Sequence, residues 1–417
     1  SCHVFGDFDS LAWDLGDPDF DVLPNPIPIN LEQGAGLVFS PINGTGNVRE
    51  FNPMKGPMTT QTLRGMVNHG SMHWRGDRTG GNDDSDGDGI PDGDPFDSDA
   101  AFRKFNVAFD GLLGGEVPLE DSDEMLKFSA FILEVTLPPN PVRALDDSLT
   151  PDEQAGRNFF FGESLQSALG LGPRRSDGLP FDFGQEEPLG FTCDGCHTLA
   201  PENGHFGTAG RASFEAETQI VKIPHLRNLY QKVGMFGLAP TLGINPGDHR
   251  HMGPQVRGTG FLHDGSIDTL FRFFSATVFA NTGLVGFESD LQRRQMERFM
   301  LASDTDLPPI VGQQVTLTAA SGPDVNGRID LLLQRANAAF TSKVLGGEAI
   351  ECDLVVKGIA EGAPHGWVHT DGDQFVRDDS EPIADAALRL LALMPGHELT
   401  YTCLPPGSGS RWVTPRP

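Results

Sequence analysis

Cys193-Asp194-Gly195-Cys196-His197 is the stretch from which the rest of this chain is interpreted. Two cysteines separated by two residues and followed directly by a histidine form the C-x-x-C-H pattern of covalent c-type haem attachment. In that chemistry the thiols add to the porphyrin vinyl groups, and the histidine becomes the proximal iron ligand. A redox cysteine pair does not need the histidine, and a zinc site needs a second ligand pair, which does not follow here. We therefore predict Cys193 and Cys196 as haem anchors and His197 as an iron ligand.

Cys2-His3 has the form of the last two residues of a second such motif. Its first cysteine would then lie upstream of Ser1, so we expect the numbering to begin inside a longer precursor, and a signal peptide cannot be judged from this sequence. On this interpretation Cys2 anchors a second haem and His3 is its proximal ligand.

An internal repeat of about 170 to 190 residues supports two haem sites. The same landmarks occur twice in the same order, which is hard to obtain by chance. The paired landmarks are Thr62-Leu63-Arg64-Gly65 and His225-Leu226-Arg227-Asn228, Ser71-Met72 and Gly234-Met235, residues 102–109 and 271–279, and residues 125–128 and 296–299, the last pair each leading to Leu-Pro-Pro. The sequence therefore predicts two tandem haem domains.

The predicted fold class is mainly α: two cytochrome c-like domains with long loops at residues 1–145 and 146–310, and a small α+β appendage at 311–417. Residues 122–134 and 289–301 have apolar side chains at helical spacing, and Thr150-Pro151 begins another helix. In the appendage, residues 314–318, 354–356 and 399–402 are predicted strands, and residues 329–335 and 384–393 are predicted helices.

Charge and cysteine usage indicate the compartment and exclude some partners. The chain has 58 acidic and 30 basic residues, a formal net charge of −28, so nucleic acid and anionic membrane surfaces are poor partners. It has no run of 18 apolar residues that would span a membrane. Haem attachment to cysteine takes place outside the cytoplasm, where disulfides persist, so we expect a periplasmic or extracellular protein. Cys352 and Cys403 are predicted to pair, the alternative being two separate buried thiols.

An acidic loop at about residues 82–99 has the alternating pattern of a calcium site. Asp84-Ser85-Asp86-Gly87-Asp88-Gly89-Ile90-Pro91-Asp92 matches D-x-D-x-D-G-x-x-D, and it resembles thrombospondin type-3 repeats. Alternate carboxylates converge on a hard cation, and the glycine permits the sharp turn. The alternative is a solvated acidic loop. The predicted calcium ligands are Asp84, Asp86, Asp88, the carbonyl of Ile90, Asp92 and Asp94.

The motifs of residues 1–310 together resemble the bacterial di-haem cytochrome c peroxidase and MauG superfamily. The second copy has Ile223-Pro224-His225-Leu226-Arg227-Asn228 and then Phe261-Leu262-His263-Asp264-Gly265-Ser266, and the first has His73-Trp74-Arg75-Gly76-Asp77-Arg78. The resemblance implies that Trp74 bridges the two haems, with an ordinary core aromatic as the alternative. It also implies that Arg64 and Arg227 lie near haem propionates, since a guanidinium group matches a carboxylate.

The distal iron ligands depart from the family pattern. Residues 273–280 contain no Met, Tyr or His where the peroxidases place a distal Met, and residues 51–58 offer methionines in place of a distal His. Met72 and Met235 occupy equivalent repeat positions and are candidate thioether ligands. His69 and His73 are alternatives in the first copy, and His251 is the alternative in the second.

Three classes of function follow. The missing distal residues favour a di-haem c-type cytochrome that transfers electrons to or from a redox protein partner. The alternative is a di-haem peroxidase that reduces hydrogen peroxide, although no catalytic residue is assigned beyond Trp74 as an electron bridge. A module of a larger envelope assembly is the third interpretation.

Overall fold

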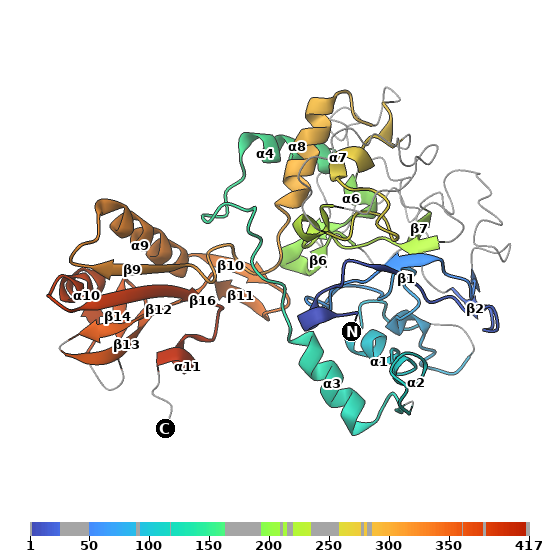
Figure 1. Cartoon of the computed structure of the whole chain (residues 1–417), viewed down its shortest axis with the longest axis horizontal. Helices are drawn as coiled ribbons and strands as arrows, with labels where there is room; N and C mark the ends of the chain where they lie inside the picture. The colour runs from blue at the N-terminus through green and yellow to red at the C-terminus, as the bar shows by residue number, and fades with distance from the viewer. Residues whose placement is uncertain are drawn as a thin grey trace. The chain divides into compact units, whose positions relative to one another are not determined.

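The structure is a computed structural model. It describes residues 2–25, 50–88, 92–116, 118–162, 193–208, 212–214, 220–234, 258–276, 279–281, 286–360, 362–377 and 381–413. Contacts divide the chain into two compact units (Figure 1). The first comprises Ser1–Leu137 and Leu149–Ser303, and the second comprises Pro138–Ser148 and Asp304–Pro417. Both predicted repeat copies therefore belong to one unit, and the division into three domains at residues 145 and 310 stays a prediction.

The first unit combines short helices with two-stranded antiparallel ladders. Its helices are α1 (Ser98–Arg103), α2 (Ala108–Gly111), α3 (Asp123–Leu133), α4 (Pro151–Phe160), α6 (Cys193–Cys196), α7 (Leu270–Phe273) and α8 (Asp290–Leu301), with 3₁₀ turns η1 (Val4–Gly6), η2 (Gly80–Asn82), η3 (Pro201–Asn203) and η4 (Leu229–Lys232). Its ladders pair β1 (Ala12–Asp14) with β4 (Pro57–Thr59), β2 (Leu23–Pro24) with β3 (Glu50–Phe51), β5 (Leu199–Ala200) with β6 (His205–Phe206), and β7 (Ala212–Phe214) with β8 (Ile220–Lys222).

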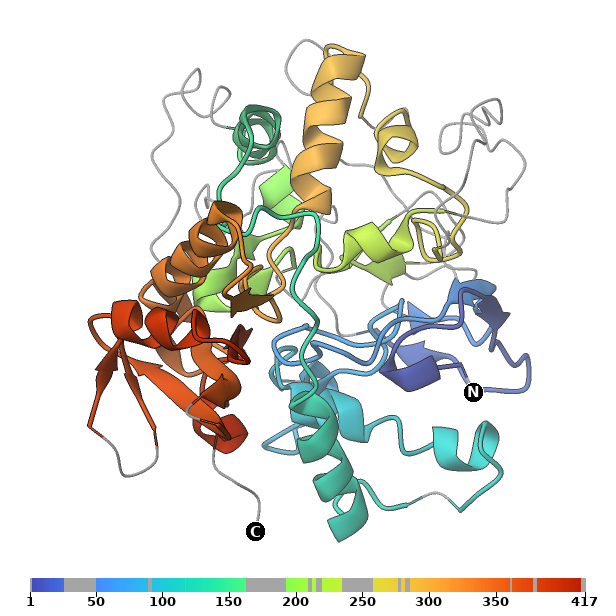
Figure 2. The same cartoon turned by 60° about the vertical axis from the view of Figure 1, so that its left-hand side comes forward.

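The three helices predicted in this unit are present, and each begins at a side-chain cap. Thr150 forms a reciprocal capping box with Glu153 at the start of α4, and Ser122 and Ser289 cap α3 and α8. Figure 2 shows α3 and α8 at opposite ends of the first unit, one in each repeat copy. Helix α4 packs closely on α8. A Cβ atom at Gly156 would lie 2.3 Å from the carbonyl oxygen of Gln295, so the absence of a side chain at Gly156 permits this approach.

The second unit is built on a six-stranded antiparallel sheet of order β15-β14-β13-β12-β16-β9. Its strands are β9 (Gln314–Thr318), β12 (Asp353–Ala360), β13 (Ala363–Thr370), β14 (Gln374–Val376), β15 (Ile383–Ala384) and β16 (Glu398–Leu404), beside the hairpin β10 (Ala339–Ser342) and β11 (Gly347–Ile350). Its helices are α9 (Pro323–Ala336), α10 (Asp385–Ala392) and α11 (Gly409–Val413). The three predicted strands and the predicted helix 329–335 lie within these elements, and the predicted helix 384–393 exceeds α10 by one residue at each end.

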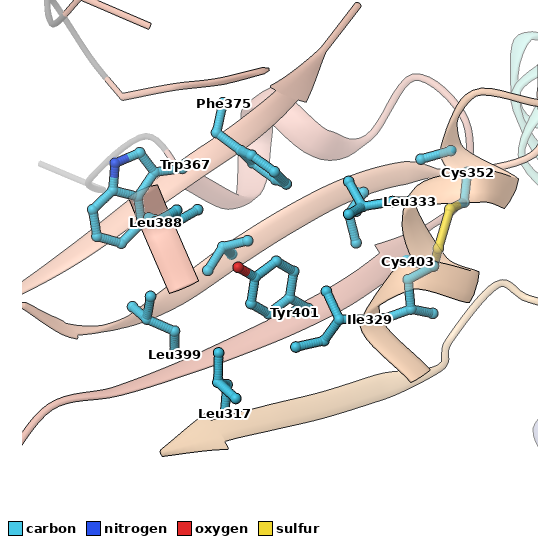
Figure 3. Packing of buried hydrophobic residues seen from close by; sticks show 14 of the residues in the cluster. Leu317, Ile329, Leu333, Cys352, Trp367, Phe375, Leu388, Leu399, Tyr401 and Cys403 are labelled. Carbon is cyan, nitrogen blue, oxygen red and sulfur yellow. A yellow bond between two sulfur atoms is a disulfide. The ribbon is translucent and has the colours of Figure 1, made fainter. Parts of the chain in front are cut away.

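The core of the second unit lies between the sheet and its helices (Figure 3). Tyr401 is fully buried there with Ile329 and Leu333 of α9. The disulfide between Cys352 and Cys403 confirms the predicted pairing and joins the start of β12 to β16.

The prediction of a mainly α fold is wrong. Of the described residues 29% are helical and 21% lie in strands or bridges, and the six-stranded sheet makes this a mixed α and β protein. The ladders of the first unit are two or three residues long. Strands that short contain too few alternations of apolar and polar residues to produce a signal in the sequence. The glycine-rich and proline-rich connections that contain these ladders therefore have the sequence character of loops.

The disulfide predicts a specific loss of stability in the second unit. Replacing both cysteines (Cys352→Ala with Cys403→Ala) frees a chain loop with a sequence separation of 51. The loop-entropy estimate is a decrease of about 4 kcal/mol in the free energy of unfolding. Urea unfolding followed by the fluorescence of Trp367 measures this loss, and reduction of the unsubstituted protein should reproduce it. An unchanged midpoint in both experiments would show that the bond contributes nothing.

Candidate functional site

The C-x-x-C-H motif forms one helical turn on the edge of a large apolar cluster. Helix α6 contains both cysteines, and the backbone N–H of His197 donates to the carbonyl of Cys193 at 2.7 Å. Cys193 packs against the buried cluster of the second repeat copy, which is rich in phenylalanine. The helical turn places Cys193 beside this apolar surface, and His197 directly follows the turn. The residues present therefore fit a covalently attached porphyrin.

The histidine of the motif is oriented by two backbone carbonyls. His197 Nδ1 lies 3.0 Å from the carbonyl oxygen of Gly207 and 3.1 Å from that of Pro224. A carbonyl only accepts hydrogen bonds, so Nδ1 carries the proton and the lone pair of the neutral ring is on Nε2. Metal-bound histidines commonly donate their other ring N–H to such an acceptor, which fixes the ring and its tautomer. The geometry around His197 is thus that of an Nε2 iron ligand.

His3 has an equivalent environment in the first copy. Burial lowers the pKa of His3, and hydrogen bonds of its imidazole with the backbone of Gln61 and Asp7 act in the opposite direction. Gln61 stands directly before Thr62-Leu63-Arg64, as Pro224 stands before His225-Leu226-Arg227. The two histidines therefore use carbonyls at equivalent repeat positions.

A further pair of backbone hydrogen bonds completes this equivalence. The N–H of Leu63 donates to the carbonyl of Gly6, and the N–H of Leu226 donates to that of Phe206, both at 2.8 Å. Cys2 and His3 are both exposed, whereas Cys193 and His197 are half-buried. Backbone hydrogen bonds at equivalent positions therefore recur around both histidines, although the second copy encloses its site more.

Trp74 lies at the junction between the copies, where backbone hydrogen bonds are exchanged almost symmetrically. The N–H of Lys222 donates to the carbonyl of Trp74 at 2.8 Å, and the N–H of Thr59 donates to that of His263 at 2.7 Å. Thr59 and Lys222 each stand four residues before the leucine of the L-R segment, so the two bonds are repeat equivalents. The indole of Trp74 is buried and donates from Nε1 to the carbonyl of Thr59 at 2.7 Å.

The turns that carry these acceptors have the same backbone conformation. His73 and Leu262 adopt φ values of 65° and 64°, and Gly76 and Gly265 both adopt 74°. Each turn is closed by an antiparallel bridge, Met72 with Arg78 in the first copy and Phe261 with Ile267 in the second. Trp74 and His263 therefore occupy equivalent positions in two copies of one turn.

A buried carboxylate fixes the turn of the first copy. Asp77 accepts from His73 Nδ1 at 2.6 Å and lies 3.7 Å from the guanidinium of Arg75 and 3.5 Å from that of Arg78. Burial alone would raise the pKa of Asp77, but His73 and then the two arginines overcome it and hold this pKa well below its usual range. His73 is therefore engaged by Asp77 in this structure.

Four basic side chains gather beside Trp74. The rings of His69 and His225 meet edge to face with centroids 4.5 Å apart, and Lys232 Nζ lies 5.6 Å from the centre of the Trp74 ring. Burial, with the charges of nearby cations, keeps the pKa of both histidines well below the usual value. Burial and then the charge of Lys232 likewise lower the pKa of Lys222, and burial lowers that of Lys232 to about 8. His69 belongs to the first copy, and the other three belong to the second.

Met72 and Arg64, two further candidate haem residues, have contacts within the protein. Met72 is buried in a cluster with Met66, Phe102 and Ile132, where it fills core volume. Arg64 pairs with Asp7 at 3.4 Å. Met235 and His251 lie outside the described residues.

The acidic loop brings three of its predicted ligands together. Single carboxylate oxygens of Asp84, Asp86 and Asp88 all lie within 4.8 Å of one another, and the three side chains are exposed. Asp92 instead accepts from the N–H and hydroxyl of Ser85, at 2.8 and 2.6 Å, and Asp94 accepts from the N–H of Phe96 at 2.8 Å. Ile90 lies outside the described residues. Calcium binding by the loop stays a prediction.

Sequence reasoning missed the basic cluster and the buried Asp77. His225 belongs to the repeated segment His225-Leu226-Arg227-Asn228, and Lys222 and Lys232 carry no motif. The other basic side chains of the cluster have no distinctive sequence context. Their burial beside one another arises only because the fold brings together residues more than a hundred positions apart.

The two buried histidines predict acid sensitivity. In the unfolded chain an imidazole titrates near pH 6.5, and in the folded chain the pKa of His69 and of His225 is lower. Below pH 6.5 the unfolded state therefore binds more protons, and the free energy of unfolding falls by up to about 1.4 kcal/mol per pH unit for each ring. Urea unfolding at pH 7.5, 6.0 and 5.0 measures the slope. His69→Gln with His225→Gln should flatten it. Equal slopes in the two proteins would contradict this assignment.

Comparison with known proteins identifies no family. No protein-family model and no curated protein matches the sequence. In the part of the chain that the structure describes, no helix has the length and apolar character needed to cross a membrane. Among solved structures, a chain of the hydrazine synthase of Kuenenia stuttgartiensis is similar with a TM-score of 0.38 and 12% identity, over 71% of this chain and 77% of that one. Similarity at this level supports no conclusion about fold or function.

Proposed function

We propose that this chain is a c-type di-haem protein that transfers electrons outside the cytoplasm, in the periplasm or beyond the cell. The observation that supports it is the repeated environment of His3 and His197, each hydrogen-bonded to the backbone at equivalent positions of the two copies. A zinc site or a thiol redox pair would not require a histidine hydrogen-bonded to the backbone at equivalent positions of both copies.

The residues of the chain have distinct roles in this proposal. Cys2, Cys193 and Cys196 attach the porphyrins, and the carbonyls orient His3 and His197 toward iron. The haem iron supplies one-electron redox chemistry when bound. The phenylalanine-rich cluster around Cys193 excludes water from its surroundings. Trp74, buried between the copies and hydrogen-bonded to both, is suited to an electron path from one copy to the other.

The localisation and the partner follow from the same chemistry. Haem attachment takes place outside the cytoplasm, and the disulfide between Cys352 and Cys403 persists there. With a net charge of −28, the chain favours a redox partner that presents a basic surface. The loop of Asp84, Asp86 and Asp88 is proposed to bind calcium.

Covalent haem is the first test. The protein, produced in a host that attaches haem in the periplasm, should retain two haems per chain after denaturation, as measured by intact mass and the pyridine haemochrome spectrum. Cys193→Ser with Cys196→Ser should remove one haem, and Cys2→Ser should weaken attachment of the other. The disulfide variant Cys352→Ala with Cys403→Ala is the matched control and should keep both. A wild-type chain that retains no haem would falsify the proposal.

Electron paramagnetic resonance of the oxidised and half-reduced protein, together with an assay of peroxide turnover, distinguishes electron transfer from peroxidase activity. Two low-spin signals in electron paramagnetic resonance, with no turnover of hydrogen peroxide, are expected for electron transfer. A stable high-spin signal from one haem together with peroxide turnover would establish the peroxidase instead.

Calcium should stabilise the acidic loop. Because a cation relieves repulsion among close carboxylates, the melting temperature of the first unit should rise when calcium is added to chelator-treated protein. Asp86→Asn with Asp88→Asn should abolish the rise, whereas Asp110→Asn, an exposed acid of α2, should preserve it. Melting curves that superimpose with and without calcium would exclude the site.

A further inference from the structure

We infer that the outer face of α3 and the adjoining end of α2 form a docking surface for a basic amphipathic helix of a partner protein. This surface consists of Phe128 and Phe131 of α3 with Leu112 and Leu113 at the end of α2, and we call it the α2–α3 face. Docking there goes beyond the proposed electron transfer and does not require bound haem.

In the second repeat copy, a helix covers the face that corresponds to this one. Helix α4 lies against α8 (Figure 1), where the ring of Phe160 meets that of Phe299 with centroids 5.5 Å apart. Gly156 brings the α4 backbone close to the same residue, since a Cβ atom at Gly156 would lie 2.8 Å from the Cβ of Phe299. Phe299 is buried as a result.

The corresponding positions of α3 are not covered. Phe128 is the repeat counterpart of Phe299, and Phe131, in the same register, is the counterpart of Ala302. Phe299 and Ala302 are buried, whereas Phe128 and Phe131 are 39% and 63% exposed. In the part of the chain that the structure describes, no helix takes the place on α3 that α4 takes on α8.

The exposed phenylalanines continue into a wider apolar surface. The ring of Phe128 meets that of Phe109 in α2 edge to face, with centroids 6.3 Å apart. Leu112 stands three residues after Phe109, so the two side chains lie on the same side of this helical turn, and Leu113 follows directly. Both leucines are exposed. Exposed apolar side chains gathered in this way, with charged residues around them, are typical of protein interaction sites.

The charge around the α2–α3 face determines which helix fits it. Residues 107–131 contain six acidic side chains and a single lysine. Glu124 stands where α8 has Gln295, and Gln295 donates to Asp152 of α4 at 3.1 Å. An acid at that position of a docked helix would be repelled by Glu124, so the helix that fits here carries a basic side chain instead.

A second copy of this chain is a poorer fit than a basic protein. Its formal net charge is the same −28, and its α4 begins with the acids Asp152 and Glu153 and already covers Phe299. An acidic surface also speeds the approach of a basic protein. The partner is therefore a basic protein whose helix has an apolar stripe and, as Gly156 does in α4, a small residue at the crossing point.

A helical peptide supplies the probe. It has the sequence of residues 149–162 with Asp152→Lys and Ala155→Lys, and a lactam bridge joins positions 154 and 158. Gln154 and Asn158 hydrogen-bond to each other at 2.7 Å on the exposed side of α4, so the bridge holds the helix without touching its apolar side. The peptide should bind the 417-residue chain in fluorescence anisotropy. The bridged peptide that keeps Asp152 and Ala155 should bind about tenfold more weakly.

Substitutions on the α2–α3 face and on its repeat counterpart locate the binding. Phe131→Ser with Leu113→Ser removes two exposed side chains without opening the core, and it should weaken binding by about tenfold or more. Glu124→Gln should weaken binding less and make it less sensitive to salt. Leu291→Ser on α8, where the side chain is 63% exposed, is the matched control and should leave binding unchanged.

Three results would overturn the docking surface. One is equal affinity of the peptide for the unsubstituted chain and for the variant with Phe131→Ser and Leu113→Ser, or binding to neither. A second is a dimer in sedimentation that this variant loses, because a second copy would then be the occupant. The third is carboxylate labelling that spares Glu124 in the protein as its natural cell produces it, purified free of partners, because another segment of the same polypeptide would then cover the face. None of these results concerns haem content, so the proposed function is tested separately.

Discussion

Two exchanged backbone hydrogen bonds, from Thr59 to His263 and from Lys222 to Trp74, hold the repeat copies of the first unit in register. Each donor ends a short strand, and each acceptor lies in a turn with the same positive-φ residues. Backbone groups make both bonds, so this register does not depend on which side chains are present. The equivalent side chains were therefore free to diverge, and an indole and an ammonium group came to lie at one junction.

That divergence gives the molecule an unusual distribution of charge. The chain is strongly acidic overall, and its acidic loop lies on the surface, whereas the junction buries Lys222 and Arg227 with two neutral imidazoles. A buried charge costs more than an exposed one, so basic groups are not retained in an interior without a compensating partner.

The same duplicated backbone fixes the two motif histidines. Carbonyls from the segment before each L-R sequence, together with one shortly after each motif, orient His3 and His197. At His197 the acceptors bind Nδ1, so the lone pair of the neutral ring lies on Nε2, where it can serve as a ligand. The intervening connections vary in length between the copies, because only the donor and acceptor positions at their ends are constrained. The second unit depends instead on a sheet, a packed core and one covalent bond.

The sequence by itself determined what depends on neighbouring residues: the cysteines and histidine of the C-x-x-C-H motif, the helix caps at Ser122, Thr150 and Ser289, and the order of the repeated segments. The disulfide was also predictable, since two cysteines remained. The sequence did not determine the short ladders, and the mainly α prediction failed for that reason. Nor did it indicate the basic cluster, whose members His69 and Lys222 are 153 positions apart. Burial and mutual distance create that cluster, and they arise only when the two copies pack together.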